Sequence, residues 1–250
     1  MTARFDVNCD LGETPLPWLG SHEPELMTLI TSANVACGGH AGDAESMRAV
    51  CTAAVQHGVA VGAQVSYPDR PNFGRVALDM HTAALDESLE QQLLALVEIA
   101  RAAGTQVSYV KPHGALYNTV VTHDAHARVV VDLAARHGLA LFGLTSSHTD
   151  TLARQCAVRF VGEWFADRGY LESGHLAPRS RSDALITLPG EIHRRVVRLV
   201  REGLVDTVDG AAITITAATI CVHSDTPGAA DLLRAVRTAL TETGVVVRAP

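Results

Sequence analysis

Apolar side chains recur at helical spacing in five segments of the chain, and a glycine closes each segment. Glycine suits the left-handed position that ends many helices. The segments span residues 47–55, 89–100, 130–134, 192–200 and 232–240, and the closing glycines are Gly58, Gly104, Gly138, Gly203 and Gly244. The sequence therefore predicts a helix before each of these glycines.

Short apolar runs without helical spacing follow most of these glycines. They cover residues 59–63, 107–110, 139–144 and 245–247. The order of strand, loop, helix and glycine repeats about six or seven times, which favours parallel strands that are buried on both faces. No linker or low-complexity tract interrupts it. We therefore expect one α/β domain over residues 1–250, built as a barrel or as a doubly wound sheet.

Polar side chains follow the predicted strands directly, at six turns along the chain. In order, these turns carry Asn8, Asp10 and Glu13; Asn34, His40 and Asp43; Gln64, Tyr67, Asp69 and Arg75; Lys111 and His113; Glu163, Asp167 and Arg168; and His223 and Asp225. In α/β barrels and in open sheets, the carboxyl ends of the strands are where sites are built. Convergence of six such turns favours a closed barrel.

Lys111 is the only lysine in a chain whose other basic residues are all arginine. It stands before Pro112, directly after an apolar run. An ammonium on a flexible stem can lose its proton when buried, which a guanidinium cannot do. We expect Lys111 to have a role that arginine cannot fill, the alternative being a single surface or ion-pair lysine.

The composition is that of a globular protein, with 250 residues, 47% hydrophobic and 19% charged. A net charge of -7 gives nucleic acid or an anionic membrane no electrostatic reason to bind, and a small anionic substrate would need a local cluster of positive charge. With no signal-peptide pattern or apolar run of membrane-spanning length, cytoplasm is the expected compartment. The five cysteines are widely spaced without a Cys-x-x-Cys pair, so we expect reduced, mostly buried thiols.

Several common catalytic motifs are absent from the sequence. The sole lysine precedes a proline, which excludes a Walker A phosphate loop, and there is neither a Gly-x-Ser-x-Gly elbow nor a His-Glu-x-x-His helix. A metal ion would therefore need scattered carboxylate and imidazole ligands such as Asp10, His40, His113 and His223.

Two turns have both a structural and a functional interpretation. Residues 36–43 place three glycines around His40, which suits close backbone approach to a ligand or simply a tight turn in which Asp43 caps the next helix. Residues 221–228 end in a segment where Asp225 or Thr226 precedes Pro227, as at the start of a helix.

Taken together and in order, these turns resemble the LamB/YcsF family. The matching stretches are residues 7–13, 32–43, 67–69, 73–75, 110–118, 163–170 and 220–229, and they run nearly from end to end. The resemblance implies a seven-stranded variant of the β/α (TIM-like) barrel, related to the glycoside hydrolase and deacetylase group. It also implies opening of 5-oxoproline to L-glutamate, with ATP as cosubstrate and two partner subunits, B and C. Gln64 and Val65 stand where many members have His-Pro, which removes one candidate metal ligand.

The implied reaction suggests roles for the polar residues. Phosphorylation of the lactam oxygen would make an electrophile that water attacks, with Asp10 or Glu163 as general base and with Lys111, His40 and Arg168 stabilising negative charge. The catalytic candidates are thus Asp10, Glu163, Lys111 and His40, and the substrate-binding candidates are Asn8, Asn34, Asp43, Tyr67, Arg75, His113, Asn118, Arg168 and His223. Two alternatives remain open: a metal-dependent deacetylase or amidohydrolase that holds a divalent ion with Asp10, His40 and His113, and a non-catalytic subunit that presents substrate.

Overall fold

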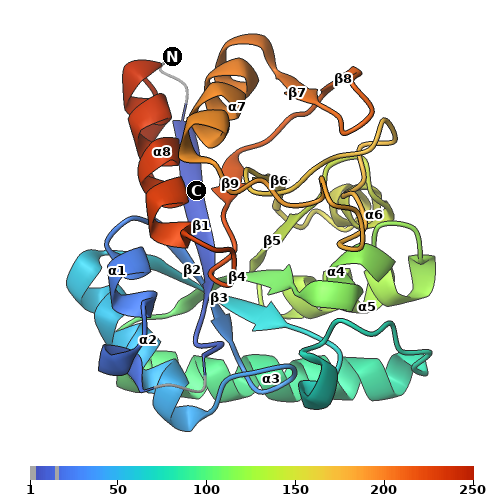
Figure 1. Ribbon diagram of the computed structural model, residues 1–250. Helices are drawn as coiled ribbons and strands as arrows, with labels where there is room; N and C mark the ends of the chain where they lie inside the picture. The colour runs from blue at the N-terminus through green and yellow to red at the C-terminus, as the bar shows by residue number, and fades with distance from the viewer. Residues whose placement is uncertain (1–3, 15–16) are drawn as a thin grey trace.

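The computed structural model describes residues 4–14 and 17–250, and its centre is a closed barrel of parallel strands (Figure 1). The barrel strands in spatial order are β1 (Arg4–Leu11), β2 (Ser32–Ala36), β3 (Ala60–Val65), β4 (Val107–Pro112), β5 (Ala140–Gly143), β6 (Phe160–Phe165) and β9 (Thr219–Cys221). Pairing of β9 with β1 closes the ring. The predicted seven-stranded barrel is confirmed.

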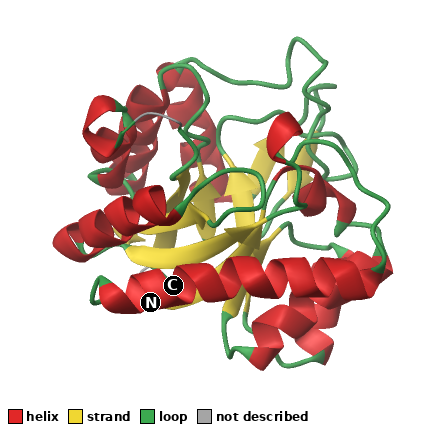
Figure 2. Ribbon diagram, turned by 90° about the horizontal axis from the view of Figure 1, so that it is seen from below, coloured by secondary structure: helices red, strands yellow, loops and turns green. Residues whose placement is uncertain are grey.

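Helices surround the strands on the outside (Figure 2). They are α1 (Glu23–Met27), α2 (Ala44–His57), α3 (Thr82–Ala102), α4 (Gly114–Thr119), α5 (Asp124–Arg136), α6 (His148–Gln155), α7 (Pro189–Glu202) and α8 (Ala229–Glu242), with two 3-10 turns, η1 (Trp18–Gly20) and η2 (Arg70–Asn72). All five predicted helices are present. Gly58 and Gly203 close α2 and α7 in the left-handed conformation, at φ 66° and 68°. None of the helices in the described part of the chain has the length and apolar character of a membrane span.

Three short strands lie outside the ring. The predicted strand at 245–247 is β10 (Val246–Val247), which pairs only with the first residues of β1. Strands β7 (Leu204–Asp206) and β8 (Ala212–Thr214) form an antiparallel hairpin between α7 and β9, which the alternating pattern did not predict.

An aromatic pair fills part of the barrel interior below the site. The ring of Tyr109 stacks on Phe142 with centroids 3.9 Å apart, and its hydroxyl donates to Asn34 Oδ1 at 2.7 Å. A β-carbon on Gly62 would lie 2.1 Å from the Tyr109 ring, so only glycine fits at that position of β3. The interior below the polar residues is therefore packed, as in other β/α barrels, and is not a pore.

The cysteines agree with the sequence prediction. Cys9, Cys37, Cys51 and Cys221 are buried free thiols, and Cys156 is a half-buried one.

Candidate active site

A cavity of about 610 Å³ opens beside the carboxyl ends of the barrel strands. Its apolar lining includes Leu144 and Phe165, and its polar lining includes Asp10, Arg75, Lys111, His113, Asn118, Thr122, Arg168, His175, Arg179 and His223. These residues come from β1, β4 and β6, the loops that follow β3, β5, β6 and β9, and the region around α4. Seven of the residues proposed from the sequence thus line one cavity.

The Lys111 ammonium lies at the base of this cavity between two carboxylates. Its Nζ is 2.8 Å from Glu163 Oε1 and 3.2 Å from Asp10 Oδ1. It also donates to Asn8 Oδ1 at 3.1 Å and contacts Cys221 Sγ at 3.2 Å. All three charged side chains are buried, so the ammonium is held by protein groups that replace its hydration.

These contacts determine the charge states of Lys111 and Asp10. Burial lowers the pKa of Lys111, but Asp10, Cys221 and Glu163 outweigh burial and raise it well above its usual value. Although burial alone would favour loss of the proton, two carboxylates stabilise the ammonium, so Lys111 is protonated. Burial raises the pKa of Asp10, but Lys111 and His223 outweigh burial and lower it below its usual value, so Asp10 is ionised.

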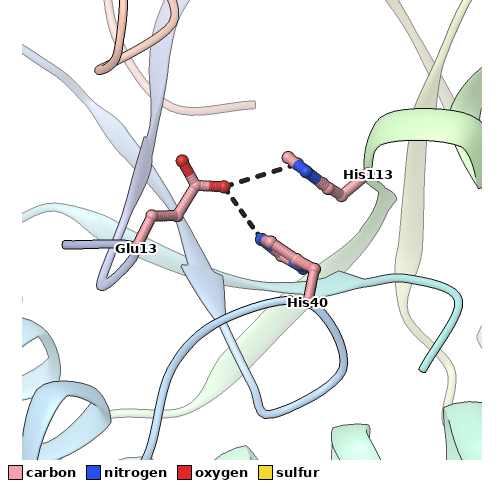
Figure 3. A group of neighbouring side chains, drawn as sticks. All are labelled: Glu13, His40 and His113. Carbon is pink, nitrogen blue, oxygen red and sulfur yellow. Dashed lines mark hydrogen bonds and ion pairs between the residues drawn. The ribbon is translucent and has the colours of Figure 1, made fainter. Parts of the chain in front are cut away.

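A second cluster adjoins the cavity through His113 and consists of Glu13, His40, His113 and Gln64. Figure 3 shows both imidazoles pointing a nitrogen at the same oxygen of Glu13, with His40 Nε2 at 2.9 Å and His113 Nδ1 at 3.4 Å. Gln64 Nε2 lies 2.9 Å from Glu13 Oε1 and 2.8 Å from His113 Nδ1. His113 is held neutral, since burial and then His40 lower its pKa well below the usual range.

The Glu13 cluster has the ligand types of a divalent metal site but not the geometry. Ligand atoms of Glu13, His40 and His113 lie within 4.8 Å of one another. The two imidazole rings, however, are stacked 3.7 Å apart and only 8° from parallel, so their nitrogen lone pairs run side by side instead of meeting at one point. The Gln64 amide also donates into the space between Glu13 and His113. As these four side chains lie here, a metal ion with bonds of about 2.0 to 2.2 Å does not fit among them.

His223, on another wall of the cavity, is paired with a buried carboxylate. Its Nδ1 lies 3.1 and 3.0 Å from the two oxygens of Asp167, and its backbone N–H donates to Asp167 Oδ2 at 3.1 Å. The Thr226 hydroxyl donates to the same oxygen at 2.6 Å. The imidazole also stacks on Phe165, with centroids 4.9 Å apart. The His223 backbone, Thr226 and Phe165 thus hold the Asp167–His223 pair at the cavity wall.

The rim of the cavity carries three arginines. Arg75 forms an ion pair with Asp225, and Arg179 Nη1 lies 3.8 Å from the same carboxylate. Arg168 is buried and donates to the backbone oxygens of Ala184 and Ala177, which fixes the segment between β6 and α7. The guanidinium groups of the rim therefore outnumber its carboxylate, which gives the local positive cluster that an anionic substrate requires.

Comparison with known proteins identifies the family. The LamB/YcsF family profile matches residues 5–250. The chain belongs to the LamB/YcsF family. It is 47% identical over 247 residues to the A subunit of 5-oxoprolinase from Streptomyces avermitilis, covering 98% of this chain and 99% of that one. It is 44% identical over 253 residues to the protein of the same name from Cutibacterium acnes, covering 99% of each.

Solved structures of related proteins have the same fold as this chain. The lactam utilization protein of Thermus thermophilus superposes with a TM-score of 0.92 at 37% identity, covering 99% of this chain and 100% of that one. A family 4 carbohydrate esterase from Streptomyces lividans has a TM-score of 0.51 at 13% identity, covering 98% and 91%. The esterase shares only the barrel architecture, whereas the Thermus protein resembles this LamB/YcsF chain throughout.

Six residues proposed from the sequence do not line the cavity of this LamB/YcsF barrel. Asn8, Asn34 and Glu163 lie in the layer beneath it, where Asn34 Nδ2 donates to Asn8 Oδ1 and Asp10 Oδ1 and Asn8 Nδ2 donates to Glu163. His40 lies behind His113. The Tyr67 hydroxyl bonds to His126 Nδ1, away from the cavity.

The sixth residue, Asp43, is exposed and caps α2 by accepting from the backbone N–H groups of Glu45 and Ser46, as its structural interpretation predicted. The glycines before it allow close internal packing, since a β-carbon on Gly42 would lie 2.1 Å from Ala36 O. Asp225 and Thr226 do not cap α8, whose N-cap is Gly228; they hold Arg75 and Asp167 instead.

The site also includes residues that were not among the candidates proposed from the sequence, namely Glu13, Gln64, Asp167, Arg179 and Asp225. Glu13 takes the place beside the histidines that was expected for Asp10, whose Oδ2 is 3.9 Å from His113 Nδ1. The turn at Gly12, with φ 75°, directs Glu13 toward the histidines, and buried Glu23 holds it through the N–H groups of Gly12 and Glu13. The position of Glu13 three residues after Asp10, in the same turn, was the feature of the sequence that could have indicated its place in the site.

Proposed function

We propose that this chain is the substrate-binding and ring-opening subunit of an ATP-dependent 5-oxoprolinase. The enzyme would convert 5-oxoproline to L-glutamate as ATP becomes ADP and phosphate, together with two partner subunits, B and C. The names of the close relatives support the substrate. The observation that carries the proposal is the cavity, which combines a basic rim with an ionised carboxylate and an ammonium at its base in a chain of net charge -7.

The cavity matches the parts of 5-oxoproline, a small cyclic amide that carries one carboxylate. The substrate carboxylate would exchange with Asp225 for the guanidinium groups of Arg75 and Arg179, whose side chains are 40% and 35% exposed. The apolar ring carbons would lie against Phe165 and Leu144. This orientation turns the amide group toward Asp10 and Lys111.

Asp10 is better placed than Glu163 to receive the proton of an attacking water. Asp10 is the acidic residue that lines the cavity, whereas Glu163 is fully buried beneath it and bonded to Lys111. A positioned base of this kind contributes about 10²- to 10⁴-fold to a rate. Glu163 would instead hold the ammonium, which stabilises the negative charge that forms when the amide carbon is attacked.

The nucleotide would be bound and hydrolysed with the help of the partner subunits, because the sequence lacks a phosphate loop. The test is glutamate formation from 5-oxoproline and ATP, measured for this chain alone, for the two partner subunits alone, and for the three together. We expect turnover only in the complete mixture. Rapid lactam-dependent ATP hydrolysis by the isolated chain, or no glutamate from the mixture, would overturn the proposal.

A metal-dependent amidohydrolase is the second candidate, favoured by the carboxylate and two imidazoles of Glu13, His40 and His113. It requires the parallel rings to rotate and the Gln64 amide to turn its unpartnered oxygen toward the ion. Elemental analysis of the purified chain distinguishes the two functions. One tightly held metal ion per chain, with activity that a chelator abolishes in the absence of ATP, would favour the amidohydrolase.

A further inference from the structure

The Asp167–His223 pair has a geometry that binding of a substrate anion does not explain. Asp167 is fully buried and accepts from the His223 backbone, the His223 ring and the Thr226 hydroxyl. A bond from Nδ1 to a buried carboxylate fixes the ring and its tautomer, as in other carboxylate–imidazole pairs. The structure gives His223 Nε2 no partner among residues 4–14 and 17–250, while the side chain lines the cavity.

The imidazole is surrounded by charges of both signs. Burial lowers the pKa of His223, but Asp167 in contact and Asp10 on the neighbouring strand β1 raise it above its usual value, against the opposing charge of Arg179. His113, the N-cap of α4, also lies near it but is neutral. The neighbouring Phe165 ring carries no charge. The Asp167 carboxylate on Nδ1 therefore favours the protonated imidazole, and the ring lines the cavity with Nε2 free to donate a proton there.

We infer that His223 is the general acid that protonates the leaving nitrogen when the lactam C–N bond breaks, and that Asp167 is its positioning residue. This inference rests on the proposed function and deepens it. The water oxygen forms a bond to the lactam carbon and gives one proton to Asp10. As the C–N bond breaks, its electron pair passes to nitrogen, which takes the Nε2 proton of His223. The phosphoryl group that ATP placed on the lactam oxygen is left in an acyl phosphate, which a second water cleaves to glutamate and phosphate. Solvent returns a proton to His223 and takes up the protons released from Asp10 and from the two waters, so the cycle balances.

The placement of the two groups on neighbouring strands supports these roles. Asp10 on β1 is ionised because its pKa is lowered, whereas His223, which follows the neighbouring strand β9, has a raised pKa because Asp167 stabilises the imidazolium. A base and an acid whose pKa values are pushed apart by their surroundings can act on the two sides of one bond. Asp167 itself stays ionised, since His223 and Thr226 outweigh burial and lower its pKa.

The test compares His223→Gln and Asp167→Asn with the wild-type chain in the complete three-subunit enzyme. Loss of a general acid should lower kcat about 10²- to 10⁴-fold with little change in KM, because the proton moves only in the transition state. Exposed His148, which lies outside the cavity, provides the matched control His148→Gln. A rise in KM at unchanged kcat in His223→Gln would instead make His223 a binding residue and overturn the inference.

A second measurement separates positioning from folding. The kcat–pH profile should fall on its alkaline side at the pKa that NMR of the labelled His223 imidazole reports. Both the NMR pKa and this alkaline limb should move to lower pH in Asp167→Asn, because the carboxylate that stabilises the imidazolium is gone. An unchanged alkaline limb with a shifted NMR pKa would overturn the acid role. Absence of glutamate formation by the wild-type enzyme would overturn the proposed function itself, a different result from full turnover by His223→Gln.

Discussion

Lys111 on β4 and Glu163 on β6 form a buried ion pair across the barrel, with Nζ 2.8 Å from Oε1. Asp10 on β1 binds the same ammonium from the other side at 3.2 Å. Buried charges are costly unless they are paired and hydrogen-bonded, and removal of one member leaves the others uncompensated. This ion triad therefore links the stability of the barrel to the charge at the base of the cavity.

Lys111→Arg should abolish most activity of the complete enzyme while the protein still folds. The guanidinium keeps the positive charge, but it is wider than the ammonium and cannot reproduce the close contacts with Asp10, Glu163 and Asn8. Overpacking of this kind costs about 1 to 3 kcal/mol of folding free energy. Glutamate formation and urea unfolding would be measured together. Near-normal turnover would show that only the charge matters.

Lys111→Met provides the companion variant. It removes the charge at similar length and leaves Asp10 and Glu163 as neighbouring buried carboxylates without their cation. We expect a loss of about 3 to 5 kcal/mol in the free energy of unfolding, the usual cost of breaking a buried ion pair from one side. A stability equal to that of Lys111→Arg would mean that the ion triad adds little to the fold.

Asp10→Asn and Glu163→Gln should both reduce activity, but for different reasons. Asp10 lines the cavity, so its amide variant should lower kcat by about 10² or more through loss of the base. Glu163 lies beneath, so its variant should act through the position of Lys111 and lower kcat less. Turnover by each variant would be measured beside its thermal unfolding, with exposed Glu45→Gln as a control. Full activity of Asp10→Asn would remove Asp10 from the mechanism.

Arg179→Gln should raise KM for 5-oxoproline about 5- to 50-fold with little effect on thermal stability. The side chain is part of the basic rim and its ion pair with Asp225 is partly exposed, where such pairs add about 0 to 1 kcal/mol to stability. Asp225→Asn is the matched control, since it removes the competing carboxylate and should lower KM. If neutral analogues of 5-oxoproline lose affinity to the same extent, the rim does not recognise the substrate carboxylate.

The Asp167–His223 pair should stabilise the fold within a defined pH window. The pKa of Asp167 is lowered, so its contribution is present above its unfolded value of 3.8 and is lost as pH falls through the folded pKa. The pKa of His223 is raised, so its contribution is complete below 6.5 and is lost as pH rises through the folded pKa. The stability difference between wild type and Asp167→Asn should therefore be largest between about pH 4 and 6.5.

Urea unfolding from pH 3 to 9 measures this window. Asp43, whose pKa is lowered mainly by the Ser46 N–H, has no histidine partner, so Asp43→Asn should change only the acidic side of the profile. A difference between wild type and Asp167→Asn that stays constant over the whole range would contradict the pairing.

The sequence by itself determined the architecture. Helical apolar spacing closed by Gly58, Gly104, Gly138, Gly203 and Gly244, with apolar runs between, defines alternating helices and parallel strands because each pattern is local and buries one kind of surface. It also placed Asp10, Lys111, His113 and His223 at strand ends, where barrel geometry brings them together. The β7–β8 hairpin was not predicted because it interrupts the alternation of helices and parallel strands.

Only the tertiary structure decided the chemistry of each side chain. Lys111 stays protonated because two residues, 101 positions before it and 52 after it in the sequence, supply carboxylates within 3.2 Å. Glu13 lies beside the histidines, where Asp10 was expected, because the chain turns at Gly12. Asp167 contacts His223 because β6 pairs with β9. Distance and burial set charge states, and neither is encoded in local sequence spacing.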